Sequence, residues 1–157
     1  AIKIHCVAHP DWLLFPEKLS EICTFAGEKQ LPVMFHTGTE TPAHIFCEYC
    51  KNFPQTTFIL AHGNPIDETI QIMKNCKNVF VDTAFLPIPN ISTLCENGLS
   101  DRILFGTDFP ITSYFYKDKT PLLWYKDNIA KFVEIFGEKQ FLLWSNGNYR
   151  SVFGEGR

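Results

Sequence analysis

The sequence predicts an α/β fold with a parallel sheet, and two observations carry this prediction. Short apolar segments of strand length alternate with segments whose apolar residues recur at helical spacing, one pair roughly every thirty residues. Three of the strand segments also share one pattern, because "MFHTG", "ILAHG" and "LFGTD" each join an apolar run to a polar residue and glycine. Strands separated by helices form βαβ units, whose strands are parallel.

Length and composition limit the classes of protein. The chain has 157 residues, 45% hydrophobic and 20% charged, which fits a single domain over residues 1–157 with a substantial core. The net charge of −3, without blocks of like charge, argues against nucleic acid or an anionic membrane as partner. No apolar run has membrane-helix length and no signal peptide opens the chain, so we expect a cytoplasmic protein.

The first half of the chain contains three predicted strands and two predicted helices. Residues 1–9 alternate Ile2 and Ile4 with Lys3 and His5, the period-two pattern of a strand. The predicted helices have apolar stripes, and the first begins near Pro16, a residue suited to a first helical turn. The next two strands end at histidines followed shortly by glycine. The later segments are a helix at 15–30, a strand at 31–40, a helix at 42–53 and a strand at 57–65.

The second half continues the alternation. A helix is predicted at 66–76, a strand at 78–85, a helix at 90–98, a strand in 101–110 and helices at 120–137, 138–145 and 148–154. Asn90 and Gly98 are the expected cap and stop of the helix at 90–98. Ile103 to Phe105 form the apolar run of the last strand, which turns at Gly106.

The six cysteines are interpreted as reduced thiols. They are scattered along the chain, and the chain is larger and more apolar than a disulfide-stapled domain. Cys47 and Cys50 form a C-x-x-C within a helical pattern, but no second pair stands at metal-site spacing.

His36, His62 and Asp108 are the candidate site residues. Each closes or follows a predicted buried strand, so all three are expected at the carboxyl edge of one sheet, where ligand and catalytic groups gather in parallel α/β folds. Neutral imidazole and carboxylate are the usual ligands of zinc or a similar divalent ion. Without a metal, the same groups could act as acid and base, or as hydrogen-bonded structural residues.

The motifs "FHTG", "LAHG", "ILFGTDFP" and "GNYRSVFG" together resemble, in this order, the second half of the amidohydrolase-related family. In the last motif, Ser151 stands where the family usually has arginine. Members of this family are metal-dependent (β/α)8 barrels. The resemblance therefore implies that this chain supplies about strands 4–8 of such a barrel, together with its C-terminal helices.

The resemblance also implies a role for each candidate. His36 would be the fifth-strand metal ligand, and Asp108 the eighth-strand ligand that also exchanges protons with water or substrate. His62 would be a catalytic acid and substrate polariser, or a ligand of a second metal. Lys3 and His5 would end the fourth strand and contact the substrate. A plain lining role is the alternative for Lys3, and both are favoured over the carboxylated lysine that bridges two metals in some relatives, because Lys3 comes early in the strand.

A His-x-His pair, which supplies two further ligands in the family's first strand, is absent from this sequence. We therefore expect the chain to be the C-terminal part of a longer protein, or a truncated product. The open alternatives are a metal-dependent hydrolase that uses metal-activated water, a carboxy-lyase on the same scaffold, and a catalytically inactive fragment. A TatD-type nuclease is disfavoured because its fourth-strand Glu is missing from "AIKIHC".

The expected cofactor is a divalent metal, with zinc first, and the expected partner is a small-molecule substrate. A homo-oligomer and a missing N-terminal segment both stay open as further partners. Specificity is expected in the loop after Asp108, where Tyr114, Phe115 and Tyr116 either line a pocket or pack on the neighbouring helix.

Overall fold

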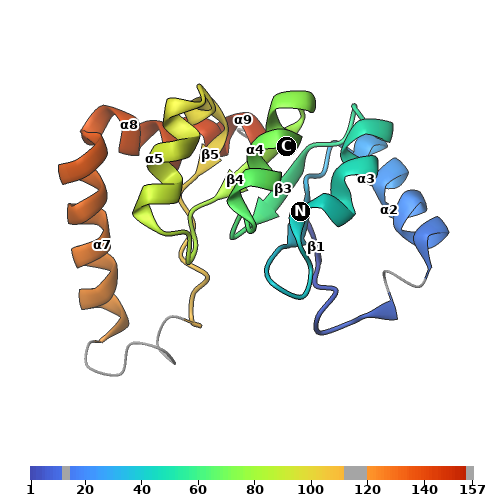
Figure 1. Cartoon of the computed structure of the whole chain (residues 1–157), viewed down its shortest axis with the longest axis horizontal. Helices are drawn as coiled ribbons and strands as arrows, with labels where there is room; N and C mark the ends of the chain where they lie inside the picture. The colour runs from blue at the N-terminus through green and yellow to red at the C-terminus, as the bar shows by residue number, and fades with distance from the viewer. Residues whose placement is uncertain (12–14, 112–119, 155–157) are drawn as a thin grey trace.

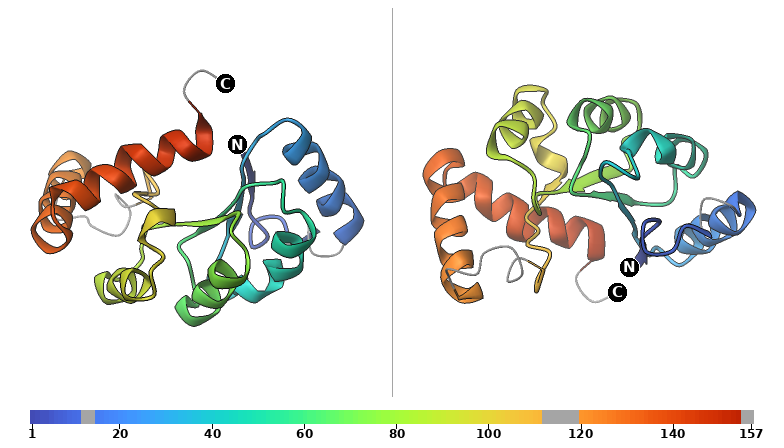
Figure 2. Two further views of the ribbon diagram at one scale, coloured as in Figure 1. Left: turned by 90° about the horizontal axis from the view of Figure 1, so that it is seen from above. Right: turned by 60° about the horizontal axis from the view of Figure 1, so that its bottom comes forward.

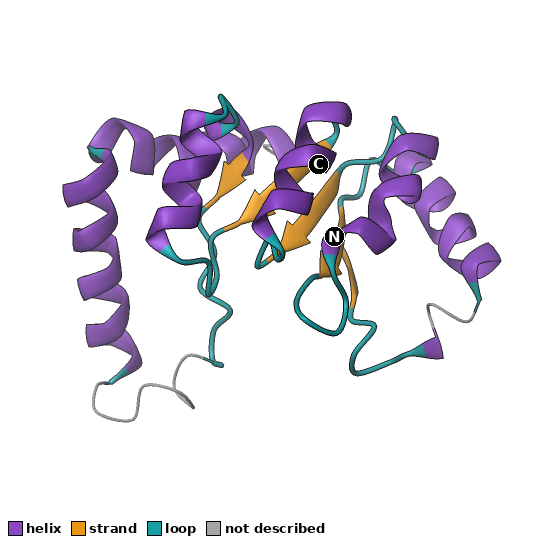
Figure 3. Cartoon of the chain, viewed as in Figure 1, coloured by secondary structure: helices purple, strands orange, loops and turns teal. Residues whose placement is uncertain are grey.

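A parallel sheet forms the centre of the computed structural model, which describes residues 1–11, 15–111 and 120–154. Within these residues it has five strands in the order β1-β2-β3-β4-β5, and every neighbouring pair is parallel. The strands are β1 (Ile2–Ile4), β2 (Val33–His36), β3 (Phe58–Ala61), β4 (Val79–Asp82) and β5 (Ile103–Leu104). The predicted α/β fold with parallel strands is confirmed, and Figure 3 shows helices around the sheet.

The helices between the strands follow the predicted order (Figure 1). They are α2 (Pro16–Glu28), η1 (Ala43–Phe46), α3 (Cys47–Asn52), α4 (Ile66–Asn75), α5 (Ile88–Glu96) and η2 (Ser100–Arg102). The predicted helix at 42–53 is therefore a 3₁₀ turn followed by one short α-helix. After β5 come α7 (Pro121–Phe136), α8 (Glu138–Leu142), the π-helical η3 (Leu143–Gly147) and α9 (Asn148–Phe153).

Two details of the sequence prediction are wrong. Asn90 does not cap α5, because the helix already begins at Ile88 after Pro87, and the Asn90 N–H donates to the Pro87 carbonyl inside the first turn. Phe105 does not belong to β5, because its N–H donates to the Trp144 carbonyl at 3.1 Å instead of to a neighbouring strand.

The two faces of the sheet have different partners. Phe35, Leu60 and Val81 lie on the face covered by the helices and belong to the larger apolar core. Ile59 and Leu104 lie on the opposite face, where they pack with Val152 of α9 in a separate cluster. Figure 2 shows α8 and α9 running across the side of the sheet away from α4 and α5. The alternation of side chains along each strand therefore divides the buried residues into two cores.

The C-terminal helices are fixed to the last strand by polar side chains. The buried Asn148 amide donates to the Ile103 carbonyl at 2.6 Å, and the Trp144 indole N–H donates to the Ser100 carbonyl at 2.9 Å. These bonds satisfy carbonyls that would otherwise be buried without partners.

All six cysteines are separate thiols, and Cys6, Cys23, Cys50 and Cys76 are buried. Burial raises the pKa of the Cys50 thiol, which keeps it in the unreactive neutral form. Among the helices of the described residues, none combines the length and apolarity needed to span a bilayer.

Candidate active site at the carboxyl edge of the sheet

Polar side chains gather where neighbouring strands end. His36 and Asp82 are the last residues of β2 and β4, while His5 and His62 follow β1 and β3 directly. The parallel register aligns these ends, since Ile4 pairs with Phe35 and His36 pairs with Ala61. The prediction that His36 and His62 would meet at one edge agrees with this arrangement.

Three histidine rings lie in a row across β1, β2 and β3. The His5 and His36 rings are stacked, with centroids 3.9 Å apart and planes inclined by 11°. The His62 ring meets His36 edge-on, with centroids 4.8 Å apart. Burial, followed by the neighbouring His5 and His62, lowers the pKa of His36 to about 4. His36 is therefore neutral near pH 7, which is the form that binds a metal.

Hydrogen bonds fix the buried His62. Its backbone N–H donates to Asp82 Oδ1 at 3.1 Å, and its Nδ1 lies 3.0 Å from the Ala84 carbonyl. A carbonyl oxygen only accepts, so Nδ1 carries the hydrogen, and in the neutral ring Nε2 keeps its lone pair. A histidine held through one nitrogen presents the other in a defined direction, as ligating histidines do.

His5 is held differently. Its Nδ1 accepts from the Ala8 N–H at 3.2 Å, so the hydrogen of the neutral ring is on Nε2. This tautomer gives His5 a donor toward the site, whereas His62 offers an acceptor. The substrate contact predicted for His5 stays a prediction, and the structure brings its ring directly against His36.

Lys3 is the middle residue of β1, and His5 directly follows that strand. Part of Lys3 reaches solvent, but the surrounding protein atoms desolvate the ammonium and lower its pKa, against the opposing effects of Asp82 and Asp108. A cation facing the site suits an anionic substrate group. Its predicted role in substrate binding is not tested by this geometry.

Asp82 is a site residue that the sequence reasoning missed. Its side chain is buried, and Oδ1 accepts from the backbone N–H groups of both His62 and Ala84. Burial raises the pKa of this carboxyl, against those hydrogen bonds. A Cβ added at Gly106 would lie 3.1 Å from Asp82 Cγ, so the glycine allows the segment after β5 to pass close to Asp82. The available signal was "NVFVD", a strand ending in a carboxylate just as "VMFH" ends in an imidazole.

Three of the predicted site residues, His36, His62 and Asp108, line one cavity of about 470 Å³, whereas Lys3 and His5 are not among its described lining residues. Its lining comprises His36, Thr37, His62, Asn64, Phe85, Asp108 and Ile111. Thr37 joins two of the surrounding loops, because its hydroxyl donates to the Ala61 carbonyl and accepts from the Asn64 N–H. Asp108 is exposed and belongs to the loop after β5, not to the strand end itself.

Three of the residues around this cavity have left-handed backbone conformations. The φ angles are 71° at His62, 57° at Phe85 and 50° at Asp108. Such angles are uncommon outside glycine, and clusters of them are typical of functional sites.

The donor chemistry of this edge suits a divalent cation. His36 is neutral, His62 directs an unprotonated Nε2, and Asp108 supplies a carboxylate on the same cavity. In residues 1–11, 15–111 and 120–154, however, no three His, Cys, Asp or Glu side chains are grouped closely enough to hold a metal. The ligand roles of His36, His62 and Asp108 and the catalytic roles of His62 and Asp108 therefore stay predictions. Tyr114, Phe115 and Tyr116, the predicted specificity residues, lie outside the described residues.

Comparison with known proteins identifies the family. A family model described as amidohydrolase matches residues 1–132. The structure is similar to that of Amidohydrolase 2 from Bifidobacterium longum subsp. infantis, with a TM-score of 0.63, 13% identity and coverage of 82% of this chain and 51% of that one.

It is also similar to the 4-oxalomesaconate hydratase LigJ from Rhodopseudomonas palustris, with a TM-score of 0.52, 20% identity and coverage of 98% of this chain and 55% of that one. No curated protein matches the sequence. The chain thus spans about half the length of the solved structures that it matches.

The parallel sheet and these structural neighbours are those of an incomplete (β/α)8 barrel, as predicted. With a family model matching most of its length, the chain belongs to the amidohydrolase family, whose members are generally metal-dependent.

Proposed function

We propose that this chain carries part of the active site of a metal-dependent hydrolase that acts on a small molecule. The observation that supports this most directly is the pair of adjacent imidazoles, His36 and His62, on a cavity that Asp108 also lines. A divalent ion, with zinc as the first candidate, would supply Lewis acidity that acidifies water and polarises a substrate carbonyl. The ligands within this chain would be His36, Asp108 and His62.

Each residue has a separate task in this proposal. His36 remains neutral and offers an imidazole nitrogen to the ion. Asp108, exposed on the cavity, accepts the proton of the attacking water and returns it to the leaving group. In the neutral ring, His62 Nε2 acts as a metal ligand. In the protonated ring, the same nitrogen donates to the substrate oxygen. Both roles fall to Nε2 because the Nδ1–H group donates to the Ala84 carbonyl in either protonation state.

Asp82 acts through His62 and is a positioning residue. Its Oδ1 accepts from the N–H groups of His62 and Ala84, and so joins the loop after β3, which contains the left-handed His62, to the loop after β4, which contains the left-handed Phe85. This carboxylate therefore maintains the backbone conformation that directs Nε2 to the cavity.

A carboxy-lyase is the second candidate function. The solved relative named as a hydratase supports lyase chemistry on a similar fold. Lys3 and His5 would bind the substrate carboxylate, since Lys3 lies in β1 and His5 follows that strand with its ring stacked on His36. Asp108 would then protonate the carbon that loses carbon dioxide. The two candidates are distinguished by whether carbon dioxide or a hydrolysis product is released.

We further propose that the domain of residues 1–157 works in the cytoplasm, and that the remaining ligands come from an N-terminal segment or a second subunit. The purified chain is titrated with zinc by calorimetry, alone and together with an N-terminal barrel segment carrying a His-x-His. Replacing His62 by Gln is expected to weaken zinc binding on the order of 100-fold, because one ligand is lost.

The control is His44→Gln, which removes an exposed histidine paired with Glu68 outside the cavity. Equal zinc affinity in wild type, His62→Gln and His44→Gln would contradict the proposal. Zinc binding only in the presence of the N-terminal segment would show that the isolated chain does not hold the metal by itself, which would favour the inactive-fragment alternative.

A further inference from the structure

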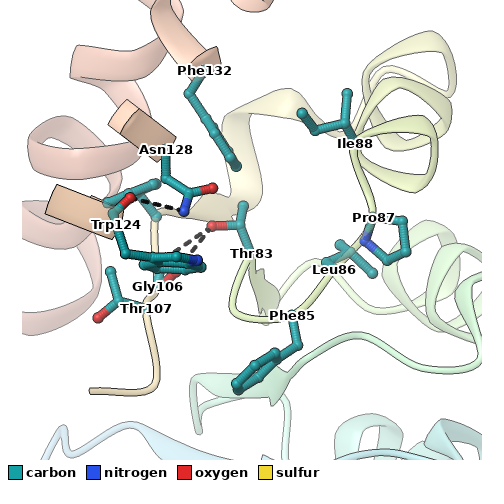
Figure 4. A pocket seen from close by; sticks show the side chains of 11 residues that line it. Thr83, Phe85, Leu86, Pro87, Ile88, Gly106, Thr107, Trp124, Asn128 and Phe132 are labelled. Atoms are coloured by element: carbon teal, nitrogen blue, oxygen red, sulfur yellow. Dashed lines mark hydrogen bonds between the residues drawn. The ribbon is translucent and has the colours of Figure 1, made fainter. Parts of the chain in front are cut away.

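A second cavity lies beside the candidate active site, between the beginning of α5 and the inner side of α7 (Figure 4). Its volume is about 270 Å³. Leu86, Pro87 and Ile88 line one side, Trp124 and Phe132 line the other, and Gly106 lies at the base. The walls are therefore mainly apolar and aromatic.

Few polar groups interrupt these walls. The Thr83 hydroxyl is occupied, because it accepts from the Gly106 N–H at 3.1 Å. The Asn128 amide donates through Nδ2 to the Trp124 carbonyl at 3.1 Å, which leaves its oxygen available to the cavity. Figure 4 shows this oxygen turned toward the α5 side. Among the described residues, no donor is bonded to it.

The volume of the cavity limits the size of the ligand that can bind in it. An engineered apolar cavity of about 150 Å³ is sufficient to hold benzene. A volume of about 270 Å³ thus accommodates one ring with small substituents but leaves no room for two. Aromatic walls favour a flat apolar ring, and the Asn128 oxygen favours a donor substituent on that ring.

This cavity adjoins the one that contains the histidines. Phe85 lines both, with its ring centroid 5.9 Å from that of His62. On the other side, Thr107 lines the apolar cavity and its neighbour Asp108 lines the histidine cavity. A ring bound against Trp124 would therefore direct a substituent past Phe85 toward Asp108.

We propose that the cavity between α5 and α7 is a ring-binding subsite, which takes one aromatic ring bearing a hydroxyl or amino group that donates to Asn128. The assignment of that ring to the substrate rests on the proposed function, whereas the binding of the ring itself does not. Asn128 would then be the residue that selects rings with a donor over unsubstituted rings.

The test uses 4-fluorophenol as the probe, observed by fluorine NMR during titration of the metal-free chain. Replacing Ile88 by Trp fills the cavity and is expected to weaken binding at least about tenfold, because the ring is sterically excluded. Ile129→Trp places the same side chain at an exposed position of α7 and should leave binding unchanged.

Asn128→Leu keeps the cavity but removes the acceptor. It is expected to weaken 4-fluorophenol about three- to tenfold while leaving fluorobenzene unaffected. If Ile88→Trp does not fold, the Asn128→Leu variant tests the ring-binding subsite by itself. Absence of 4-fluorophenol binding by the wild type, or equal binding by wild type and folded variants, would overturn the subsite.

The two proposals fail separately. His62→Gln should lose zinc yet bind 4-fluorophenol as the wild type does. If the wild-type chain binds the ring but never binds zinc, even with the N-terminal segment, the ring subsite stands and the metal-dependent function falls.

Discussion

The loops after β3 and β5 both deliver a candidate site residue with left-handed backbone, but they hold that residue in opposite ways. His62 is buried and fixed by bonds to Asp82 and Ala84, next to strands paired on both sides. Asp108 is exposed and follows a two-residue strand at the edge of the sheet. The β3 side of the site is thus preorganised by the sheet, whereas the β5 side depends on a loop.

The largest expected effect is on turnover, and it concerns Asp108 on the β5 side of the site. Asp108→Asn should reduce turnover on the order of 10³-fold, because the amide cannot accept the proton. Stability should change by less than about 0.5 kcal/mol, because the side chain is exposed. Steady-state kinetics with a substrate found by screening, together with urea unfolding, measure both. Near-normal turnover would overturn the role of Asp108.

On the β3 side of the site, the expected effect is a loss of stability when Asp82 is replaced. Asp82→Ala should lower the free energy of unfolding by about 2 kcal/mol, because it leaves two buried N–H groups without an acceptor. Asp82→Asn keeps an oxygen at this position and should cost less than half as much. Urea unfolding compares the two, with the exposed Asp101→Ala as control. An equal loss in Asp82→Ala and Asp82→Asn would contradict the bonding described.

A smaller effect is expected at Gly106, where the segment after β5 passes Asp82. Gly106→Ala places a Cβ 3.1 Å from Asp82 Cγ, and should cost about 1 kcal/mol in unfolding free energy. Gly38→Ala is the matched control, because the nearest atom to its added Cβ is His36 Nε2 at 3.9 Å. Thermal and urea unfolding of both variants would show whether Gly106 approaches Asp82 as closely as the structure indicates.

A further expected effect is the pH dependence contributed by His36. The folded chain binds the His36 proton only near pH 4, whereas the unfolded chain binds it near 6.5. His36 therefore favours the folded state above pH 6.5, and this contribution is lost as the pH falls from about 6.5 toward 4. Unfolding of wild type and His36→Asn at several pH values should show a flatter profile in the variant. Identical profiles would contradict the lowered pKa.

The sequence could predict the parallel sheet and the strand-end histidines because local patterns encode them. Alternation in "AIKIHC" and the apolar runs before His36 and His62 specify strands, and parallel pairing then brings their ends together. The end of β5 could not be predicted from its apolar run, because Phe105 is bonded to Trp144 on the C-terminal helices.

The role of Asp82 was equally hidden from the sequence. It depends on two backbone N–H groups in loops whose conformation only the folded chain defines. The stacking of His5 on His36 is also a product of register between strands, although each residue stood out as a candidate by itself. Residues whose function depends on contacts between loops are thus the ones that local patterns miss.

The central claim is that His62 offers an unprotonated Nε2 beside a neutral His36. Long-range nitrogen–proton NMR of the histidine side chains measures this directly, because it reports the tautomer of each ring and its change on adding zinc. The account predicts hydrogen on Nδ1 of His62, a neutral His36 down to about pH 4, and zinc-dependent shifts at His62 Nε2. Hydrogen on Nε2 of His62, or His36 titrating near pH 6.5, would contradict it.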